Sequence, residues 1–225
     1  MKWYKYMEFE HARALATEGR FRISSLAYYR NLEEHGNAIG DTGENTLGSI
    51  YVQDGFGFQN APKHMAELED LSGVDFIDNV FVTNYKIPPI FALCFTRRID
   101  EAIRARLNKE NEEVAQEQGK SPVIYDACVE FEHHRKIVRV LRKSILNYGL
   151  QYLDQGPCDY KRSRRYHHNG DASVPGRIPA FTKPEKYSWQ EESRIVFKPH
   201  TNLSSSEYID VHVPELVDYC RLIKF

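Results

Sequence analysis

The longest continuous apolar run in the chain is PPIFALCFT, residues 88–96, and it constrains the fold more than any other stretch. The run is far shorter than the ~20 apolar residues that a membrane-spanning helix needs. An apolar run of this length without polar alternation is typical of a strand that is buried on both faces. We therefore predict that residues 88–96 form a central strand of a sheet.

Three segments have the apolar spacing of an amphipathic helix, and each ends at a glycine, which terminates helices well. The residues expected on the buried faces are Phe9, Ala12, Leu15 and Ala16 before Gly19; Ile99, Ile103, Leu107 and Val114 before Gly119; and Ile137, Leu141 and Ile145 before Gly149.

Further strands are indicated where apolar and polar residues alternate. The segments are 3–6, 20–26, 122–131, 150–154, 193–197, 207–213 and 220–225, with a short helix near 215–217. Helices interleave with the early strands, while strands crowd the end of the chain. This order predicts an α+β fold with a mixed, mostly antiparallel sheet and flanking helices.

A chain of 225 residues suits a single domain. Residues 48–88 show little periodicity, so we expect an inserted or mobile segment there. A second surface loop is expected around 155–185, where glycine and proline are frequent.

The composition excludes several classes of function. Lys and Arg number 30 against 32 Asp and Glu, and the net charge of −2 implies no global attraction to nucleic acid or acidic membranes. Any such partner needs a local patch. The chain shows neither a membrane span nor the apolar core of a signal peptide, so we expect a cytoplasmic protein with no membrane partner.

Metal binding is not indicated either. The four cysteines lie far apart without a C-x-x-C pair, which argues against both a zinc site and a disulfide framework. The sequence Glu132-His133-His134 places adjacent side chains about 100° apart on a helix, so they cannot share one ion without a remote ligand.

Residues 160–168, YKRSRRYHH, combine basic and aromatic side chains. Single-stranded nucleic acid is bound by this combination, because cations contact phosphates and rings stack on bases. A solvated loop explains the segment equally well, and both interpretations stay open. The residues concerned are Lys161, Arg162, Arg164, Arg165 and Tyr166, with Tyr160, His167 and His168 beside them.

The stretch WQEESRI, residues 189–195, begins a late strand with consecutive polar acceptors. At the start of a strand, side chains two residues apart project to one face, so we expect Gln190 and Glu192 to share a cleft while Glu191 points away. A carboxylate in a cleft can stabilise positive charge that develops on a ribose as its base departs. The alternative is that Glu192 only pairs with Arg194 or another basic residue at the surface.

Five stretches in this order, YKY, FRISSLAYYRNLE, a GD turn, PPIFALCFT and FTKPEKYSWQEESRIVF, resemble a group of bacterial and phage-defence proteins. Their order of elements is similar to that of ADP-ribosyltransferases, including DarT-type toxins that modify nucleic acid. The resemblance spans most of the chain. It implies a split sheet, NAD⁺ as a substrate without a metal, and transfer of ADP-ribose to a macromolecule, with nucleic acid as the expected acceptor.

The resemblance also implies roles for individual residues. The QEE triplet matches the family's Q/E-x-E motif, with Glu192 as the catalytic carboxylate and Gln190 orienting the acceptor. The first NAD⁺-binding motif falls on Arg22, with Tyr4 and Tyr6 as rivals. The second falls on Ser24-Ser25 or on Tyr28-Tyr29, although the chain has neither H-G-T nor S-T-S. A toxin of this kind implies a neutralising antitoxin partner.

Overall fold

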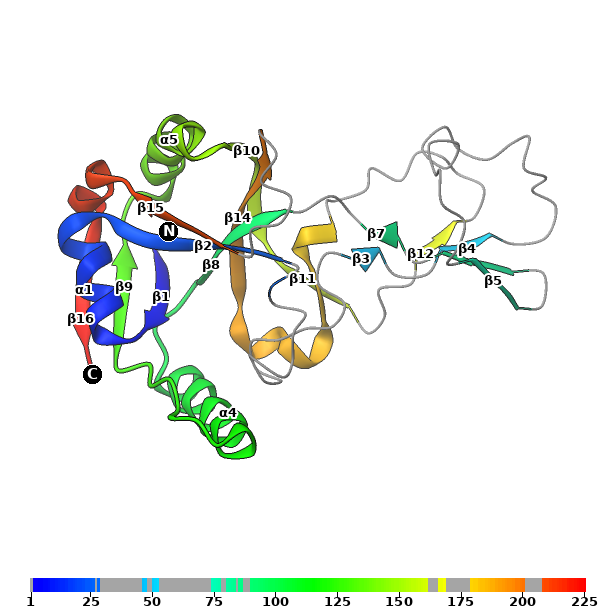
Figure 1. Ribbon diagram of the computed structural model, residues 1–225, viewed down its shortest axis with the longest axis horizontal. Helices are drawn as coiled ribbons and strands as arrows, with labels where there is room; N and C mark the ends of the chain where they lie inside the picture. Colours follow the sequence, from blue (N-terminus) through cyan, green and yellow to red (C-terminus); the bar gives the residue numbers. More distant parts are fainter. Residues whose placement is uncertain are drawn as a thin grey trace.

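The computed structural model describes residues 2–26, 28, 46–47, 50–52, 74–77, 80–83, 85–86, 90–161, 166–168, 179–200 and 208–225. In this part of the chain, an open and mostly antiparallel sheet is flanked by helices (Figure 1). The predicted α+β class is therefore confirmed.

The main sheet has eight strands among the described residues, and all of its pairs are antiparallel. The order along the sheet is β10-β14-β8-β1-β9-β16, with β2 and β15 attached at β8. The bounds are β1 (Trp3–Met7), β2 (Arg20–Ser25), β8 (Phe91–Thr96), β9 (Ala127–Phe131), β10 (Leu150–Pro157), β14 (Glu192–Pro199), β15 (Tyr208–His212) and β16 (Cys220–Lys224).

Strand β8 is the point where the sheet forks. One edge of β8 pairs with β14 along its whole length. The other edge pairs with β2 near its start, where Ser24 faces Ala92, and with β1 at its end, where Tyr4 faces Thr96. The apolar run thus forms the predicted central strand, and it joins a β2–β15 branch to a β1–β9–β16 branch.

Helices begin and end close to the predicted positions. Gly19, Gly119 and Gly149 follow their helices with φ of 71°, 63° and 72°, the left-handed conformation that glycine adopts without steric cost. The helices are α1 (Phe9–Glu18), α4 (Glu101–Gln118) and α5 (His134–Ser144); the short 3₁₀ segments are η3 (Ile145–Tyr148), η4 (Pro179–Phe181), η5 (Glu185–Gln190) and η6 (Pro214–Tyr219).

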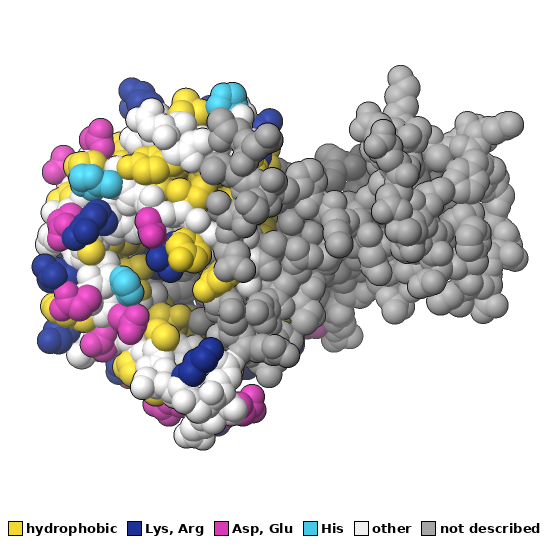
Figure 2. Space-filling view, viewed as in Figure 1, with side chains coloured by type: hydrophobic (Ala, Val, Ile, Leu, Met, Phe, Trp, Pro, Cys, Tyr) yellow, Lys and Arg dark blue, Asp and Glu magenta, His cyan; other side chains and the backbone are white. Residues whose placement is uncertain are grey.

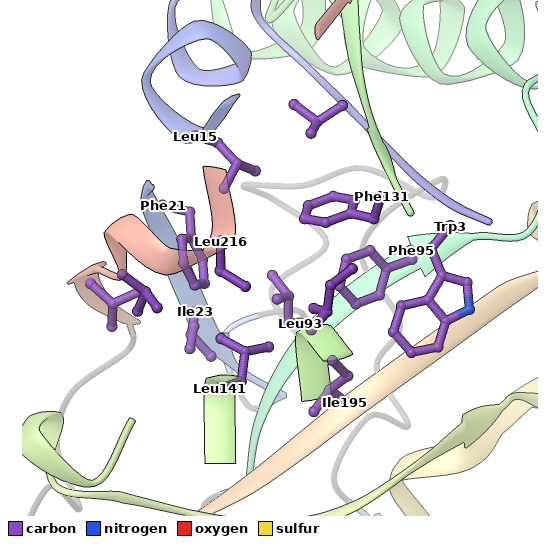
Figure 3. Packing of buried hydrophobic residues seen from close by; sticks show 14 of the residues in the cluster. Trp3, Leu15, Phe21, Ile23, Leu93, Phe95, Phe131, Leu141, Ile195 and Leu216 are labelled. Carbon is purple, nitrogen blue, oxygen red and sulfur yellow. The ribbon is translucent and has the colours of Figure 1, made fainter. Parts of the chain in front are cut away.

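The largest core lies between the sheet and the helices α1 and α5 (Figure 3). Trp3 stacks on Phe95 at 4.8 Å between ring centroids, and Phe95 meets the ring of Phe131 edge-on at 5.0 Å. Leu15 of α1 and Leu141 of α5 are buried in the same cluster. These contacts come from three neighbouring strands, so they fix the order β8-β1-β9.

Helix α4 covers the other face of the sheet, where Ile103 packs with Tyr6 and Cys128.

The start of α4 and the start of β9 differ from the sequence prediction. Ile99 is 42% exposed because the helix starts only after Asp100, whose side chain accepts a hydrogen bond from the Ala102 N–H.

The strand expected over 122–131 starts only at Ala127, and Val123 is 44% exposed. The side chain of Asn108 in α4 binds both backbone groups of Tyr125, at 2.8 Å to its nitrogen and 3.3 Å to its oxygen. The backbone polar groups of Tyr125 are therefore satisfied by a helix instead of a neighbouring strand.

Shorter strands pair outside the main sheet. Strand β11 (Asp159–Lys161) runs parallel to β13 (Thr182–Pro184), and β12 (Tyr166–His168) runs parallel to β4 (Ile50–Val52). The antiparallel pairs are β3 (Thr46–Leu47) with β7 (Tyr85–Lys86) and β5 (Val74–Ile77) with β6 (Val80–Thr83).

Candidate functional site

The junction between η5 and β14 places Gln190 and Glu192 in one pocket. Gln190 is the last residue of η5, and Glu192 is the first residue of β14. Between them, Glu191 has φ 44°, a left-handed conformation unusual for a residue with a side chain. The prediction that strand alternation brings Gln190 and Glu192 to one face is therefore wrong, because Gln190 lies outside the strand. A left-handed turn at Glu191 brings the two side chains together instead.

Lys183 of β13 binds both acceptors. Its Nζ donates to Gln190 Oε1 at 2.6 Å and to Glu192 Oε2 at 2.8 Å. The side chain of Glu191 does not contact Lys183. It pairs with Arg98 at 3.3 Å, and a third of it is exposed. The lysine thus fixes the separation of Gln190 and Glu192.

Arg194, two residues further along β14, holds the other carboxylate oxygen of Glu192. Its Nε donates to Glu192 Oε1, and its Nη1 donates to the Ala180 carbonyl oxygen at 2.5 Å. The expected alternative of a Glu192–Arg194 pair is present, but it is not at the surface: Glu192 is 8% exposed and Arg194 2%. Lys183, Glu192 and Arg194 together are called the β14 charge cluster below.

The charge cluster keeps Glu192 ionised. Burial acts to raise the pKa of its carboxyl, but the charges and hydrogen bonds of Arg194 and Lys183 outweigh burial and hold this pKa well below the usual range. The Glu192 N–H donates to the Tyr160 hydroxyl at 2.6 Å, and burial raises the pKa of that phenol. A carboxylate accepts about four hydrogen bonds, so Glu192 keeps acceptor capacity for a ligand.

Gln190 and the β14 charge cluster line a pocket of about 180 Å³ between β1, β8, β14 and α4. Sheet register aligns Glu192, Thr96 and Tyr4 in one row across β14, β8 and β1, so their side chains share a face. The Thr96 hydroxyl is buried and has no hydrogen-bond partner among the described residues. The floor of the pocket therefore offers a carboxylate next to an unsatisfied hydroxyl.

Strand β1 contributes an amine and two aromatic rings to the pocket wall. The Lys5 Nζ donates to the Cys94 carbonyl oxygen at 3.3 Å, at the fork of the sheet, and burial lowers the pKa of this amine. The Tyr6 hydroxyl is held at the start of α4, at 3.0 Å from the Asp100 carbonyl oxygen. Its ring stays on the pocket side, as does that of Tyr4.

Most of the residues predicted to bind NAD⁺ lie elsewhere. Arg22 is half-exposed on β2, where it pairs with Asp210 at 2.8 Å and lies over the Tyr208 ring at 3.7 Å. Ser25 accepts a hydrogen bond from the Tyr28 N–H at 3.1 Å. Arg22, Ser24, Ser25 and Tyr28 therefore belong to the β2–β15 branch and do not line the pocket, whereas the rivals Tyr4 and Tyr6 do.

The remaining predicted residues cannot be placed as side chains. Tyr29, Arg162, Arg164 and Arg165 lie outside the described residues, and only the backbone strands that contain Lys161 and Tyr166 are described. The nucleic-acid role of this segment stays a prediction.

Sequence reasoning missed several pocket residues, among them Lys5, Thr96, Tyr125 and Lys183. Lys5, which is partly buried, carried a signal, because a lone lysine is unusual within an aromatic strand such as WYKYM. Lys183 stands within the FTKPEKYSWQEESRIVF stretch that carries the family resemblance. Thr96 carried no signal beyond its place at the end of the apolar run.

No group of three or more His, Cys, Asp or Glu side chains that could hold a metal ion occurs among the described residues. Within the same ranges, no helix is long and apolar enough to cross a membrane. Comparisons with protein-family models, with curated proteins and with solved structures find no match to this chain.

Proposed function

We propose that the protein is an ADP-ribosyltransferase that moves ADP-ribose from NAD⁺ to a macromolecular acceptor, with Glu192 as the catalytic carboxylate. The observation that carries the proposal is a buried and ionised carboxylate, held on two sides by cations, at the floor of a pocket lined by tyrosines. Perturbed ionisation inside a pocket is characteristic of functional sites.

The pocket suits one end of the dinucleotide. Its volume of about 180 Å³ is below the ~300–1,000 Å³ typical of sites that enclose a whole ligand. A nicotinamide with its ribose is the portion that this volume admits. The rings of Tyr4, Tyr6 and Tyr125 can stack on nicotinamide, and the unsatisfied Thr96 hydroxyl can bind a polar group of the ligand.

In the reaction, the bond from ribose C1′ to nicotinamide breaks, a bond from C1′ to the acceptor atom forms, and the proton of the acceptor passes to solvent water. The ribose carries positive charge between these events. Glu192 is charged before substrate binds, so it stabilises that cation without reorganising. Lys183 fixes the position of both Glu192 and Gln190, and Gln190 is placed to orient the acceptor.

The forked sheet supports the same proposal. A split sheet is what the resemblance to ADP-ribosyltransferases implies, and the pocket lies beside the fork of β8 with β1. The first NAD⁺-binding motif is assigned here to β1, with Tyr4, Lys5 and Tyr6, in preference to Arg22. The amine of Lys5 can donate a hydrogen bond to a polar group of the ligand.

The test incubates purified protein with NAD⁺ labelled in its adenylate part and with cell lysate. Label is then measured in RNA, DNA and protein, together with free nicotinamide. We expect label in a macromolecule and a loss of about 10²-fold or more in the Glu192→Gln variant. Turnover by Glu192→Gln equal to that of the parent contradicts the assignment.

Two further variants separate chemistry from folding. Glu191→Gln removes the neighbouring carboxylate, which points away from the pocket, and should leave turnover unchanged. Lys183→Gln disrupts the same buried charge cluster but leaves Glu192 paired with Arg194, so turnover should fall less than in Glu192→Gln. Equal losses in Lys183→Gln and Glu192→Gln, at a temperature where circular dichroism shows both folded, indicate a structural role only.

The same assay distinguishes other functions. Free ADP-ribose without labelled macromolecule indicates an NAD⁺ hydrolase. No nicotinamide release at all indicates a non-catalytic binding module. A toxin with an antitoxin partner predicts that expression of the chain alone slows growth and that the Glu192→Gln variant does not.

A further inference from the structure

Helix α5 carries five exposed cations and no acidic residue over His134–Ser144. At 3.6 residues per turn, these cations fall within an arc of about 120° around the helix. Ile137, Val138 and Leu141 occupy the opposite side and are buried in the core. Figure 2 shows Lys and Arg side chains at the upper rim of the molecule, over the place of α5 in Figure 1. This α5 basic face consists of Arg135, Lys136, Arg139, Arg142 and Lys143.

The charges of this face are not neutralised within the part of the chain that the structure describes. In helix α4, by contrast, cations pair with acids three or four residues away, as Arg106 does with Glu110 at 3.0 Å. The α5 cations form no ion pair with any described carboxylate. Glu215 and Asp218 are exposed on η6, which packs against α5, but neither forms one.

The arrangement of the cations opposes helix stability at one end. Arg142 and Lys143 lie in the last turn, where positive charge interacts favourably with the helix dipole. Arg135 and Lys136 lie in the first turn, where the same dipole disfavours them. Arg135 and Arg139 are four residues apart, so they also repel one another. An external polyanion would offset both costs.

We propose that the α5 basic face binds the phosphodiester backbone of nucleic acid without sequence specificity. Arg135, Arg139 and Arg142 line one shallow groove with Val138 and Lys143. The stripe from residue 135 to residue 142 is about 10 Å long, which equals the axial rise of about three base pairs of a duplex at about 3.4 Å each. The proposal is independent of the ADP-ribosyltransferase function, because binding requires no NAD⁺.

A membrane surface fits this face less well. Helices that bind membranes in the interface insert an apolar face among the acyl chains. The apolar side of α5 is already buried against the sheet, with Ile137 and Leu141 fully enclosed. The exposed side presents five cations, and phosphates require positive charge.

The experiment measures fluorescence anisotropy of labelled RNA and DNA of about 20 nucleotides, single-stranded and duplex, from about 50 to about 200 mM salt. The protein is the full chain without NAD⁺. The test variant is Arg135→Gln/Arg139→Gln/Arg142→Gln. The matched control is Arg104→Gln/Arg106→Gln/Lys109→Gln in α4, which removes the same charge from cations that are already paired.

We expect the parent and the α4 control to bind with similar affinity. The α5 variant should bind at least 10-fold more weakly at low salt, and its log–log salt slope should be shallower by about 3, one for each lost phosphate contact. Three results overturn the proposal: no binding by the parent at low salt, equal weakening by both variants, or α5-dependent binding to phosphatidylserine vesicles without binding to oligonucleotides. Loss of NAD⁺ turnover in Glu192→Gln with intact binding leaves this proposal standing.

Discussion

Replacement of Glu192 by Gln tests the energetics of the β14 charge cluster. The change removes the negative charge that Lys183 and Arg194 contact, and the side chains of these two cations are only 4% and 2% exposed. Breaking one partner out of a buried ion pair costs about 3–5 kcal/mol. Arg194 keeps the Ala180 carbonyl and Lys183 keeps Gln190 Oε1, which places the expected loss at about 3 kcal/mol.

For a chain of this length, about 3 kcal/mol corresponds to a decrease in Tm of about 6–12 °C. The loss also depends on pH in a definite direction. The pKa of Glu192 is depressed in the folded state, so its stabilising contribution is complete above its ordinary pKa of 4.5 and is lost as pH falls towards the folded value. Protonated Glu192 resembles Gln, and the difference between parent and variant should shrink below about pH 4.5.

The assay is urea unfolding, followed by the fluorescence of Trp3 and Trp189, across the range from about pH 7 to about pH 3. Glu191→Gln is the matched control, because its partly exposed pair with Arg98 should contribute less than about 1 kcal/mol. Two outcomes refute the reasoning. One is a Glu192→Gln variant as stable as the parent at neutral pH, and the other is a difference that stays constant into the acid range.

Three further predictions concern the scaffold. Gly119→Ala should lower the free energy of unfolding by about 1–2 kcal/mol, because its backbone is left-handed. Gly19→Ala should lower it clearly more, because its Cβ would lie 2.2 Å from the Val213 carbonyl oxygen. Equal decreases in Tm for the two variants contradict this prediction. Asp100→Ala should lose about 1 kcal/mol of helix capping, and Asp100→Asn should retain most of it in the same denaturation assay. Burial raises the pKa of the Cys128 thiol to about 12, so it should react with a thiol reagent in mildly alkaline buffer only as fast as the chain unfolds; faster labelling argues against its burial.

Local periodicity was sufficient to predict the helices α1, α4 and α5 and the strands of the main sheet. The run 88–96 is apolar on both faces, and the structure places it in the centre of the sheet. Glycine terminates three helical segments because it adopts positive φ freely, and that preference needs no tertiary context. Errors occur where a tertiary contact competes, as at Tyr125, whose backbone is bound by Asn108.

The geometry of the site, in contrast to the helices and strands, depends on tertiary contacts. The proximity of Gln190 and Glu192 was predicted from strand alternation, yet it results from a left-handed turn at Glu191. Positive φ at a non-glycine residue is held by surrounding structure and leaves no mark in the sequence.

The sequence by itself predicted the three long helices, the strands of the main sheet and the α+β class, because these depend on neighbours within a few residues. The QEE triplet, through the family resemblance, singled out Glu192. Only the tertiary structure decided what the carboxylate holds. Lys183 reaches Glu192 from a strand outside the main sheet, and Tyr4 reaches the pocket from the other end of the chain. Contacts between distant segments depend on how the strands pair, and in this chain β8 sets that pairing by accepting β14 on one edge and β1 and β2 on the other.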